Sequence, residues 1–582
     1  MSLGLQTLGA SPLYRWFLRR MWELEHAFER TRASGRAEDD TRIRIFVVLA
    51  FFALGFIALA FGATRAALFS DAGKGDVAAA AGGTARADLV DRNGQLLAVD
   101  LLHYGLYVDP REIWDLSETR RALGALLRDV PAERLERALR ANRRTFLVGG
   151  LTPDVRAKIN DLGLPGVSFE PESKRVYPLG STAAHLIGFT DSGGEGLAGA
   201  ELAFNEDART AAAGGAVPLS IDLRIQAALE DELGKAAAVY QPRGAIGLVT
   251  DVHTGEILGM ASWPTFDPNR AGEADPNARL NRAASSVFEM GSVFKSFTMA
   301  IGLDTGVATP QTTFDARTPL HIGYRTITDY HATHAILTMV EVFQHSSNIG
   351  TARLAVAVGP ERLARYFDAF GLTRPAKVEL LESARPLTPK KWDEDAIAST
   401  SFGHGMNVSP LALARAYGAL LNGGYLLPLT IKRLEPGAKV AGPRVLSEKT
   451  SLEVLQLMRA NVTGGSGKSA NVVGLNVGGK TGTGDKYDPA IRAYSHTKQV
   501  SSFAATFPTD GPASAPRYFV LVLMDEPHPD KTGADPTGGI VAAPAVGKVI
   551  ERIAPFVGIK RRPELIPFNP GPVTAEDAGE EH

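Results

Sequence analysis

An uncharged apolar run near the N-terminus places the strongest constraint on this chain of 582 residues. Residues 45–63 read IFVVLAFFALGFIALAFGA and contain no charged side chain. A helix of this length, at about 1.5 Å per residue, spans about 28 Å, close to the hydrocarbon core of a bilayer. A buried core helix and a cleaved signal peptide are the alternatives, but the run is long for a signal peptide and begins far from the N-terminus. The sequence therefore predicts one transmembrane helix over residues 45–63.

The arginines around this run predict its orientation. They are frequent between positions 15 and 44, whereas only Arg65 follows the run closely. Segments rich in Lys and Arg stay on the cytoplasmic side of transmembrane helices. We therefore expect residues 1–44 to form a cytoplasmic segment, with all later residues on the outer side of the membrane.

Composition narrows the classes of function. Hydrophobic residues make up 45% of the chain and charged residues 22%, which is typical of proteins that fold around apolar cores. The net charge of -2 provides no basic field of the kind that nucleic-acid-binding proteins use. The absence of cysteine excludes disulfides, thiolate catalysis and cysteine-bound zinc, and is compatible with an oxidising compartment.

Changes in pattern along the chain predict its domains. Residues 71–85 read DAGKGDVAAAAGGTA and show no periodic apolar face, so residues 64–85 are expected to be a linker. Short strand and helix patterns without a catalytic motif predict a supporting module over residues 86–222. A second domain is expected over residues 223–560. Residues 561–582, first rich in proline and then acidic, are expected to be disordered.

The second domain is expected to combine helices with an antiparallel sheet. Apolar residues repeat at helical spacing over residues 223–240, and two strand patterns flank a turn at residues 253–255. Further strands are expected over residues 473–477, 500–507 and 518–524, and further helices over residues 294–303, 410–421 and 545–553.

A serine and a lysine three residues apart, Ser292 and Lys295, form the first candidate catalytic motif. On a helix this spacing brings both side chains onto one face. The lysine can accept the serine proton only when it is neutral, so its pKa must fall from about 10.4 to near 7, through burial or a neighbouring cation. The spacing alone is not specific, because Ser495 and Lys498 repeat it.

Two further motifs make the first one specific. Ser346-Ser347-Asn348 lies between two helical patterns, where a loop can direct a hydroxyl and an amide into a cleft. Lys480-Thr481-Gly482-Thr483 follows an alternating run, so it is expected on, or at the end of, a strand that lines the same cleft. Each motif has a second copy, Ser469-Ala470-Asn471 and Lys531-Thr532-Gly533, but both copies lie in loop-forming stretches.

Three other features have simpler interpretations. Residues 464–469 read GGSGKS, but Val462 replaces the first glycine of a phosphate-binding loop, so a turn is expected. His331 and His334 lack a third ligand nearby in the sequence, which favours a solvated loop over a metal site. Glu289 is expected to organise the start of the following helix rather than to serve as an additional acid.

In the order Ser-x-x-Lys, Ser-x-Asn, Lys-Thr-Gly, the motifs resemble those of the penicillin-recognising serine acyltransferases. Over residues 86–555 the chain is similar to class B penicillin-binding proteins, through DRNGQLLA, RVYPLGSTAAHLIG, IDLRIQ and SWPTFDPN. The segments SSNIGTARLA, SFGHGMNVSPLALARAY and VLMDEP resemble the division-specific, septal transpeptidase. Two residues depart from the family pattern: Met290 stands in place of a proline, and Gly484 in place of an alanine or serine.

This resemblance implies an α+β multidomain protein with one N-terminal transmembrane helix, an elongated pedestal module and a β-lactamase-like transpeptidase domain whose antiparallel sheet is covered by helices. It implies a peptidoglycan D,D-transpeptidase that acts in the periplasm during cell division and is acylated by β-lactams. The expected partners are stem peptides ending in D-Ala-D-Ala, β-lactams, a membrane glycan polymerase and other division proteins. No metal or organic cofactor is expected.

The resemblance also implies a role for each motif. Ser292 is expected to attack the penultimate D-Ala carbonyl, with Lys295 as proton acceptor. Ser346 is expected to relay the proton to the leaving D-Ala, and Asn348 to hold the substrate amide. The expected substrate-binding residues are Lys480, Thr481, Gly482 and Thr483, and the backbone N–H groups of Ser292 and Thr483 are expected to form the oxyanion hole.

Two other kinds of activity stay open at this point. A D,D-carboxypeptidase or a β-lactamase would hydrolyse the same acyl-enzyme with water. No deacylating carboxylate is identifiable in the sequence, which argues weakly against them. A protein without turnover, either a β-lactam sensor or a scaffold for division proteins, would be acylated without forming any cross-link.

Overall fold

The computed structural model describes residues 86–562 except 212–214, 324 and 489–492, together with positions 22, 23, 26, 48, 52, 55 and 56. The predicted linker over residues 64–85 and the residues beyond 562 lie outside this part. The predicted cytoplasmic segment and transmembrane helix also lie outside it, apart from the seven single positions. In the part that is described, no helix combines the length and the apolar character needed to cross a bilayer.

A five-stranded sheet forms the first module. The long strand β2 pairs antiparallel with β1, β3 and β4, and β1 pairs in parallel with β5. The strands are β1 (Asp88–Val90), β2 (Leu96–Val108), β3 (Thr145–Leu151), β4 (Val167–Val176) and β5 (Ala216–Pro218). Because β5 returns to β1, the chain from residue 88 to residue 218 closes into one sheet.

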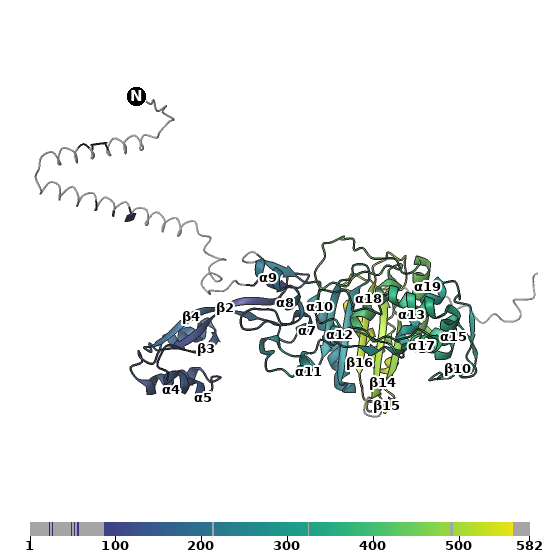
Figure 1. The fold of residues 1–582 in the computed structure, drawn as a ribbon, viewed down its shortest axis with the longest axis horizontal. Helices are drawn as coiled ribbons and strands as arrows, with labels where there is room; N and C mark the ends of the chain where they lie inside the picture. The colour runs from purple at the N-terminus through teal and green to yellow at the C-terminus, as the bar shows by residue number, and fades with distance from the viewer. Residues whose placement is uncertain are drawn as a thin grey trace, which may run out of the picture. The chain divides into compact units, whose positions relative to one another are not determined.

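Helices cover part of this first sheet. Three of them pack against β2 and β3 around a core that includes Leu106, Leu123 and Leu147 (Figure 1). These helices are α4 (Leu116–Leu126), α5 (Ala132–Leu139) and α6 (Pro153–Asn160). Three short helices follow β4, namely α7 (Ala184–Ile187), α8 (Gly199–Ala203) and α9 (Asn205–Thr210).

The second module is built on a five-stranded antiparallel sheet in the order β14-β15-β16-β6-β7. Strand β16 is apolar from Phe519 to Met524 because both of its faces are buried: Phe519 and Leu521 belong to one core, and Val520 and Val522 to the other. The strands are β6 (Gly244–Asp251), β7 (Ile257–Trp263), β14 (Gly478–Asp488), β15 (Ala493–Phe507) and β16 (Tyr518–Asp525).

Each face of this sheet has its own layer of helices (Figure 1). Helices α10 (Leu223–Tyr240) and α20 (Gly538–Ile553) pack together on one face. The other face carries the larger core, formed by α13 (Lys295–Asp304), α14 (Met339–Gln344), α15 (Asn348–Val358), α16 (Pro360–Ala369), α17 (Glu394–Thr400), α18 (Pro410–Leu421) and α19 (Glu448–Gly464).

Short elements connect these layers. The short strands pair as β8 (Phe288–Glu289) with β13 (Asn407–Val408), β9 (Thr313–Asp315) with β12 (Ile336–Thr338), and β10 (Leu320–Ile322) with β11 (Arg325–Ile327). The short helices are η1 (Pro268–Arg270), α11 (Pro276–Arg279), α12 (Arg282–Ser285), η2 (Gly291–Phe294) and η3 (Lys468–Ala470).

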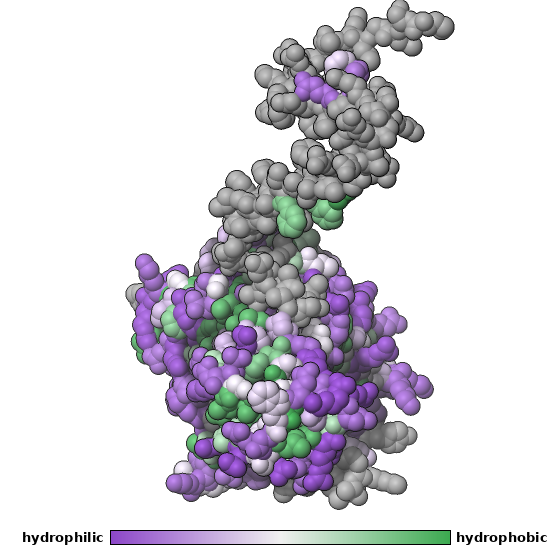
Figure 2. Space-filling view, turned by 90° about the vertical axis from the view of Figure 1, so that its left-hand side faces the viewer, coloured by the Kyte–Doolittle hydropathy of each residue, from purple (hydrophilic) through white to green (hydrophobic). Residues whose placement is uncertain are grey.

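The surface agrees with this distribution of apolar residues into cores. In the face shown in Figure 2, apolar patches are interrupted by hydrophilic residues and do not form one continuous band. Hydrophilic residues therefore surround the apolar patches on this face.

The predicted α+β fold with an antiparallel sheet and helices is confirmed. The helices expected over residues 223–240 and 410–421 match α10 and α18, and the expected hairpin is formed by β6 and β7. The strand expected over residues 473–477 is wrong. Gly474 and Asn476 adopt positive φ angles there, which turns the chain, and the strand begins only at Gly478. Helix α20 begins at Gly538, earlier than expected, and continues through Pro544.

Candidate active site

Ser292 lies one helical turn before Lys295, as the motif spacing predicted. Ser292 belongs to η2, which continues directly into α13 with Lys295 as its first residue. Lys295 is fully buried, whereas Ser292 is half-buried. Within the described residues the Ser292 hydroxyl has no hydrogen-bond partner, so it is free to bond to a ligand.

The structure brings a lysine from each of two motifs to one hydroxyl group. Lys295 Nζ lies 3.0 Å from Ser346 Oγ and also donates to the Ser346 carbonyl oxygen. Lys480 Nζ, from β14, lies 3.0 Å from the same Oγ. The three sequence motifs therefore meet at Ser346, although the chain separates them widely.

Burial sets the protonation of both lysines. It lowers the pKa of Lys480 to about 7. The pKa of Lys295 falls well below its usual range because of burial first and then the charge of Lys480, while the Asp329 carboxylate acts in the opposite direction. Two ammonium groups this close in a buried site repel each other, which favours the loss of a proton from one of them. Both burial and the charge of Lys480 destabilise the protonated form of Lys295, whereas burial is the effect on Lys480.

The Ser346-Ser347-Asn348 loop joins α14 to α15, as the sequence predicted. Ser346 adopts a left-handed conformation with φ of 57°, which is uncommon for a residue with a side chain. Ser347 then caps α15, its hydroxyl accepting from Gly350 N at 3.0 Å. Asn348 is the first residue of α15, and its Nδ2 donates to Thr328 O at 3.0 Å.

The Lys480-Thr483 motif lies within β14 rather than at its end. The segment that contains Ser292 runs so close to this strand that side chains do not fit between them. A Cβ at Gly291, where φ is 58°, would lie 2.4 Å from Thr483 O, and a Cβ at Gly482 would lie 2.6 Å from Met290 O. The glycine of the motif therefore allows the strand and the serine-bearing turn to form one wall of the site.

The two departures from the family pattern lie at this contact. A Cβ at Gly484 would lie 2.9 Å from Glu289 O, so glycine fits the backbone spacing seen here. Met290 is buried in the larger core. Nothing in the structure explains why methionine replaces proline at this position.

Thr481 and Thr483 connect the strand to segments that the sequence motifs did not include. Thr481 Oγ1 lies 2.7 Å from Ser466 Oγ and 3.2 Å from Lys480 Nζ. Asn461 accepts from Ser466 N and donates to Gly479 O at 2.8 Å. The turn expected over residues 464–469 therefore contributes Ser466 to the site, and apart from the glycines of this turn no sequence pattern indicated that contact.

Thr483 makes the second of these connections. Its Oγ1 accepts from Gly538 N at 3.2 Å, at the start of α20. The Thr481 hydroxyl thus lies beside the buried amine of Lys480, and the Thr483 hydroxyl lies at the start of helix α20. Both surroundings stabilise an anionic group.

The second copies of the motifs do not join the site. Ser495 and Lys498 lie on strand β15, where residues three apart point to opposite faces. Their spacing therefore does not bring the two side chains together as it would on a helix. Asn471 Oδ1 accepts a hydrogen bond from Arg459 Nη1 at 2.8 Å. Thr532 closes a local turn with Asp530.

Glu289 does not organise the start of the helix, contrary to expectation. Helix η2 has no side-chain cap, and Glu289 instead belongs to β8, where its carboxylate accepts from Tyr494 Oη at 2.8 Å. Burial raises the pKa of Glu289. His404 lies nearby, its ring centroid 6.0 Å from that of Tyr494, and burial lowers its pKa to about 4.

His331 and His334 have other neighbours. His334 Nδ1 lies 3.1 Å from Arg317 O, and the His331 ring packs against Tyr330. Among the described residues, no group of three or more His, Asp or Glu side chains is arranged to hold a metal ion.

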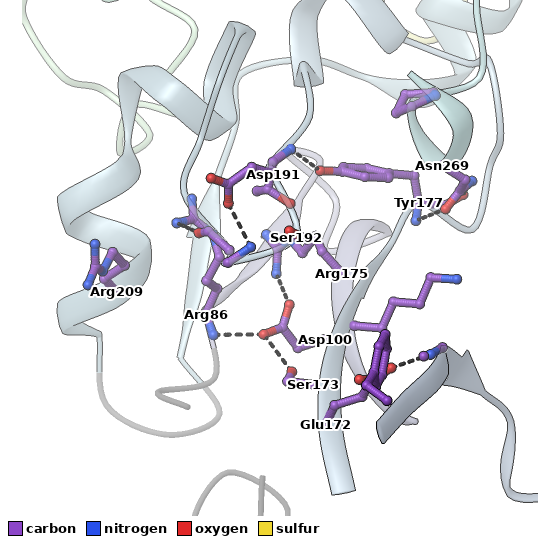
Figure 3. A pocket seen from close by; sticks show the side chains of 18 residues that line it. Arg86, Asp100, Glu172, Ser173, Arg175, Tyr177, Asp191, Ser192, Arg209 and Asn269 are labelled. Atoms are coloured by element: carbon purple, nitrogen blue, oxygen red, sulfur yellow. Dashed lines mark hydrogen bonds and ion pairs between the residues drawn. The ribbon is translucent and has the colours of Figure 1, made fainter. Parts of the chain in front are cut away.

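A hollow of about 650 Å³ is lined by residues of β2, β3, β4 and the 190–194 loop, together with Pro268 and Asn269 of the second module (Figure 3). Arg86 and Arg175 both bind Glu201, and Arg175 also binds Asp100 at 3.1 Å. Asp100 in turn accepts from Ser173 Oγ at 3.0 Å and from the backbone N–H of Arg86. These charges neutralise one another, so the network ties the first residue of the module to its central strands.

Two family models match the chain. The model of the "Penicillin binding protein transpeptidase domain" matches residues 245–551, and that of the "Penicillin-binding Protein dimerisation domain" matches residues 83–207. The chain belongs to the penicillin-binding protein transpeptidase family, and the class B, division-type assignment predicted from its motifs is confirmed.

Several curated relatives have peptidoglycan transpeptidase names. The chain is 65% identical over 583 residues to the "Probable peptidoglycan D,D-transpeptidase FtsI" of Caulobacter vibrioides, covering 98% of this chain and 99% of the relative. It is 32% identical to the "Peptidoglycan D,D-transpeptidase FtsI" of Escherichia coli K12, over 80% of this chain and 83% of the relative. It is 34% identical to the "Probable peptidoglycan D,D-transpeptidase PenA" of Neisseria gonorrhoeae, over 81% and 85%.

Proposed function

We propose that this chain is a serine D,D-transpeptidase that cross-links peptidoglycan stem peptides during cell division, with Ser292 as its nucleophile. The family assignment and its relatives support the reaction. Lys295 lies one helical turn after Ser292 and meets Lys480 at Ser346 Oγ, and this arrangement carries the assignment of the residues. β-Lactams would acylate the same serine.

In the first half of the reaction, neutral Lys295 removes the proton from Ser292 Oγ, which attacks the carbonyl carbon of the penultimate D-Ala. The backbone N–H groups of Ser292 and Thr483 receive the resulting oxyanion, and the close approach of Gly291 to Thr483 supports this pairing. The C–N bond then breaks as the proton passes through Ser346 to the leaving nitrogen. D-Ala departs and an ester on Ser292 remains.

Substrate recognition is assigned to the remaining motif residues. Charged Lys480 and the hydroxyls of Thr481 and Thr483 would bind the terminal carboxylate of the donor peptide, and Asn348 would hold its amide. Gly482 keeps the strand close enough for these contacts. In the second half of the reaction, the amine of another stem peptide loses a proton to Lys295 and attacks the ester. The new amide forms as Ser292 Oγ leaves and regains its proton.

We also propose that residues 45–63 anchor the enzyme in the inner membrane, with residues 1–44 in the cytoplasm and residues 86–560 in the periplasm. The described positions Val48, Phe52 and Phe56 are helical and exposed, as the apolar side chains of a helix in contact with lipid would be. A membrane glycan polymerase and other division proteins are the proposed partners.

Penicillin labelling of two serine variants tests the nucleophile. Ser292→Ala should abolish the covalent adduct, on the order of a millionfold loss in rate. Ser495→Ala is the matched control, because Ser495 also precedes a lysine by three residues, and should be labelled like the parent protein. A mass-spectrometric adduct on any residue other than Ser292 would contradict the assignment.

A second measurement separates transpeptidation from its alternatives. The intact enzyme is given a donor peptide ending in D-Ala-D-Ala together with an acceptor peptide. Cross-linked product should accompany D-Ala release. Release of D-Ala without cross-links would indicate a carboxypeptidase, and penicillin trapping without any turnover would indicate a sensor.

A further inference from the structure

A short segment outside the three motifs, residues 328–330, runs beside the Ser346-Ser347-Asn348 loop and binds it. Thr328 O accepts from Asn348 Nδ2 at 3.0 Å. Asp329 accepts through both carboxylate oxygens, from Ser347 Oγ at 2.7 Å and from Ile349 N at 3.0 Å. Tyr330, on the other side, donates its hydroxyl to Asp535. The segment is thus held at both ends.

The two bonds of Asp329 fix one particular residue of the loop. Ser347 is bound through its hydroxyl, and the N–H of Ile349 in the first turn of α15 is bound beside it. A carboxylate is well placed at a helix N-terminus, where backbone N–H groups lack partners within the helix. The position of Ser347 relative to residues 328–330 is therefore determined by two charge-assisted hydrogen bonds.

Capping alone does not account for this arrangement. Helix α15 already has a cap, because Ser347 Oγ accepts from Gly350 N. Helices α18 and α19 are capped by a single serine in the same way, at Ser409 and Ser447. What Asp329 adds is a restraint on the serine that provides the cap.

This restraint acts on the residue that the two lysines contact. Ser346 precedes Ser347 directly and has a positive φ of 57°. Such a conformation is costly for a residue with a side chain and persists only where its surroundings enforce it. If Ser347 were released, Ser346 would relax toward an ordinary conformation, and its Oγ would leave the position 3.0 Å from each amine.

We propose that Asp329 is a positioning residue of the acylation reaction, which holds Ser346 between Lys295 and Lys480 by anchoring Ser347. This inference rests on the proposed roles of Ser292, Lys295 and Ser346. Asp329 touches no reacting atom. Its contribution is to keep the proton route from Lys295 through Ser346 in one geometry before substrate arrives.

The test uses variants of the full-length protein and a chromogenic penicillin. Asp329→Asn keeps the shape but places an N–H₂ group against one of the two donors, so the acylation rate constant at saturating penicillin should fall at least tenfold. Ser347→Ala should produce a similar loss, and Ser347→Thr, which restores a hydroxyl, should recover most of the rate. Asp315→Asn is the matched control, because that carboxylate binds the neighbouring Arg317 at the surface.

The pH profile separates positioning from charge. The charged or titratable groups that influence Lys295 are Lys480 from β14, Asp329, and His404 from the segment after α17. Loss of the Asp329 charge should move the acidic midpoint of the acylation profile to lower pH. Ser347→Ala keeps that charge and should lower the maximal rate without moving the midpoint. A positioning role for Asp329 therefore predicts that both variants lose acylation rate and that only Asp329→Asn shifts the acidic midpoint.

Three outcomes would overturn the inference. One is a parental acylation rate in Asp329→Asn, and another is a fully active Ser347→Ala, which would leave Asp329 with a purely electrostatic effect. The third is a rate loss that follows the fraction of unfolded protein in a thermal melt. In each case an adduct that still forms on Ser292 would leave the proposed function intact, whereas an adduct elsewhere would remove the basis of both.

Discussion

Lys295 and Lys480 share one neighbour: the Nζ atoms of both lie 3.0 Å from Ser346 Oγ, although one comes from helix α13 and the other from strand β14. Both side chains are fully buried. Their protonation states are therefore coupled, and a change at one amine alters the other. This coupling allows one lysine to act as a base while the other remains a cation that can bind a carboxylate.

Replacing Lys295 by arginine tests whether its neutral form is required. A guanidinium keeps its proton at any pH at which the enzyme is folded, so it cannot accept the proton of Ser292. Lys295→Arg should therefore be nearly as damaging to penicillin acylation as Lys295→Ala. Stopped-flow acylation measures this directly. Substantial acylation by the arginine variant at neutral pH would mean that Lys295 acts only as a fixed cation.

The pH dependence of acylation should have a limb for each lysine. In the free enzyme the rate should rise with pH as Lys295 loses its proton, because only the neutral amine is a base. It should fall again around pH 7 as Lys480 loses the charge that binds the carboxylate, since burial lowers its pKa to about 7. The ratio of the acylation rate constant to the apparent dissociation constant reports this profile.

Lys480→Arg provides the control for that profile. Arginine keeps its charge, so the falling limb should move to much higher pH, even though the less compact guanidinium lowers the maximal rate. A falling limb that stays near pH 7 in this variant would assign it to a group other than Lys480.

Gly482→Ala should damage the site by pushing two backbones apart. The new Cβ would lie 2.3 Å from Ser502 Oγ and 2.6 Å from Met290 O, and such overpacking costs about 1 to 3 kcal/mol. We expect a lower melting temperature and an acylation rate reduced by about tenfold or more, because Ser292 moves away from Thr483. Differential scanning calorimetry and penicillin labelling measure the two effects.

Gly234→Ala is a suitable control for this substitution. Gly234 lies inside α10, and a Cβ there would meet no atom within 4 Å. Alanine in a helix interior is favoured over glycine by about 0.5 to 1 kcal/mol. The control should therefore be slightly more stable and fully active. An equally inactive control would show that the loss in Gly482→Ala has no local cause.

Periodicity in the sequence predicted the helices and strands that flank the site. Helix α10 has the predicted bounds because its apolar residues repeat at helical spacing, and α18 has them because its run rich in Ala and Leu is buried along nearly its whole length. The strand expected over residues 473–477 failed for a local reason. Its residues alternate like a strand, but positive φ angles at Gly474 and Asn476 produce turns that hydropathy does not record.

The motifs predicted which side chains gather but not what holds them. Asp329 and Ser466 reach the site through tertiary contacts with Ser347 and Thr481, and neither has a spacing that distinguishes it from an ordinary loop residue. The contact of Glu289 was likewise not predicted, because its position just before Ser292 suggested a helix cap. Its pairing with Tyr494 depends on a strand that follows about 200 residues later.

The membrane anchor and the catalytic module should be separable. All the motifs lie after residue 290, in a module whose sheet packs against two cores, the larger of which also includes residues of the first module such as Leu89 and Leu186. Arg86 is part of the buried network with Glu201 and Asp100, so a soluble protein must begin before this residue. A chain starting at residue 83 should fold, remain in solution and be acylated by penicillin, because every group of the proposed site lies after residue 290. Failure of this protein to bind penicillin would contradict the separation.

In cells the same soluble protein should fail to support septal cross-linking. An anchor confines the enzyme near nascent strands and raises its effective concentration there. Replacing residues 45–63 with an unrelated transmembrane helix distinguishes confinement from specific contact. Gly55 and the alanines of this run offer small surfaces on which another membrane helix can pack closely. We therefore expect the exchanged helix to place the enzyme in the membrane without restoring division. Full complementation by the exchanged helix would instead show that confinement alone is sufficient.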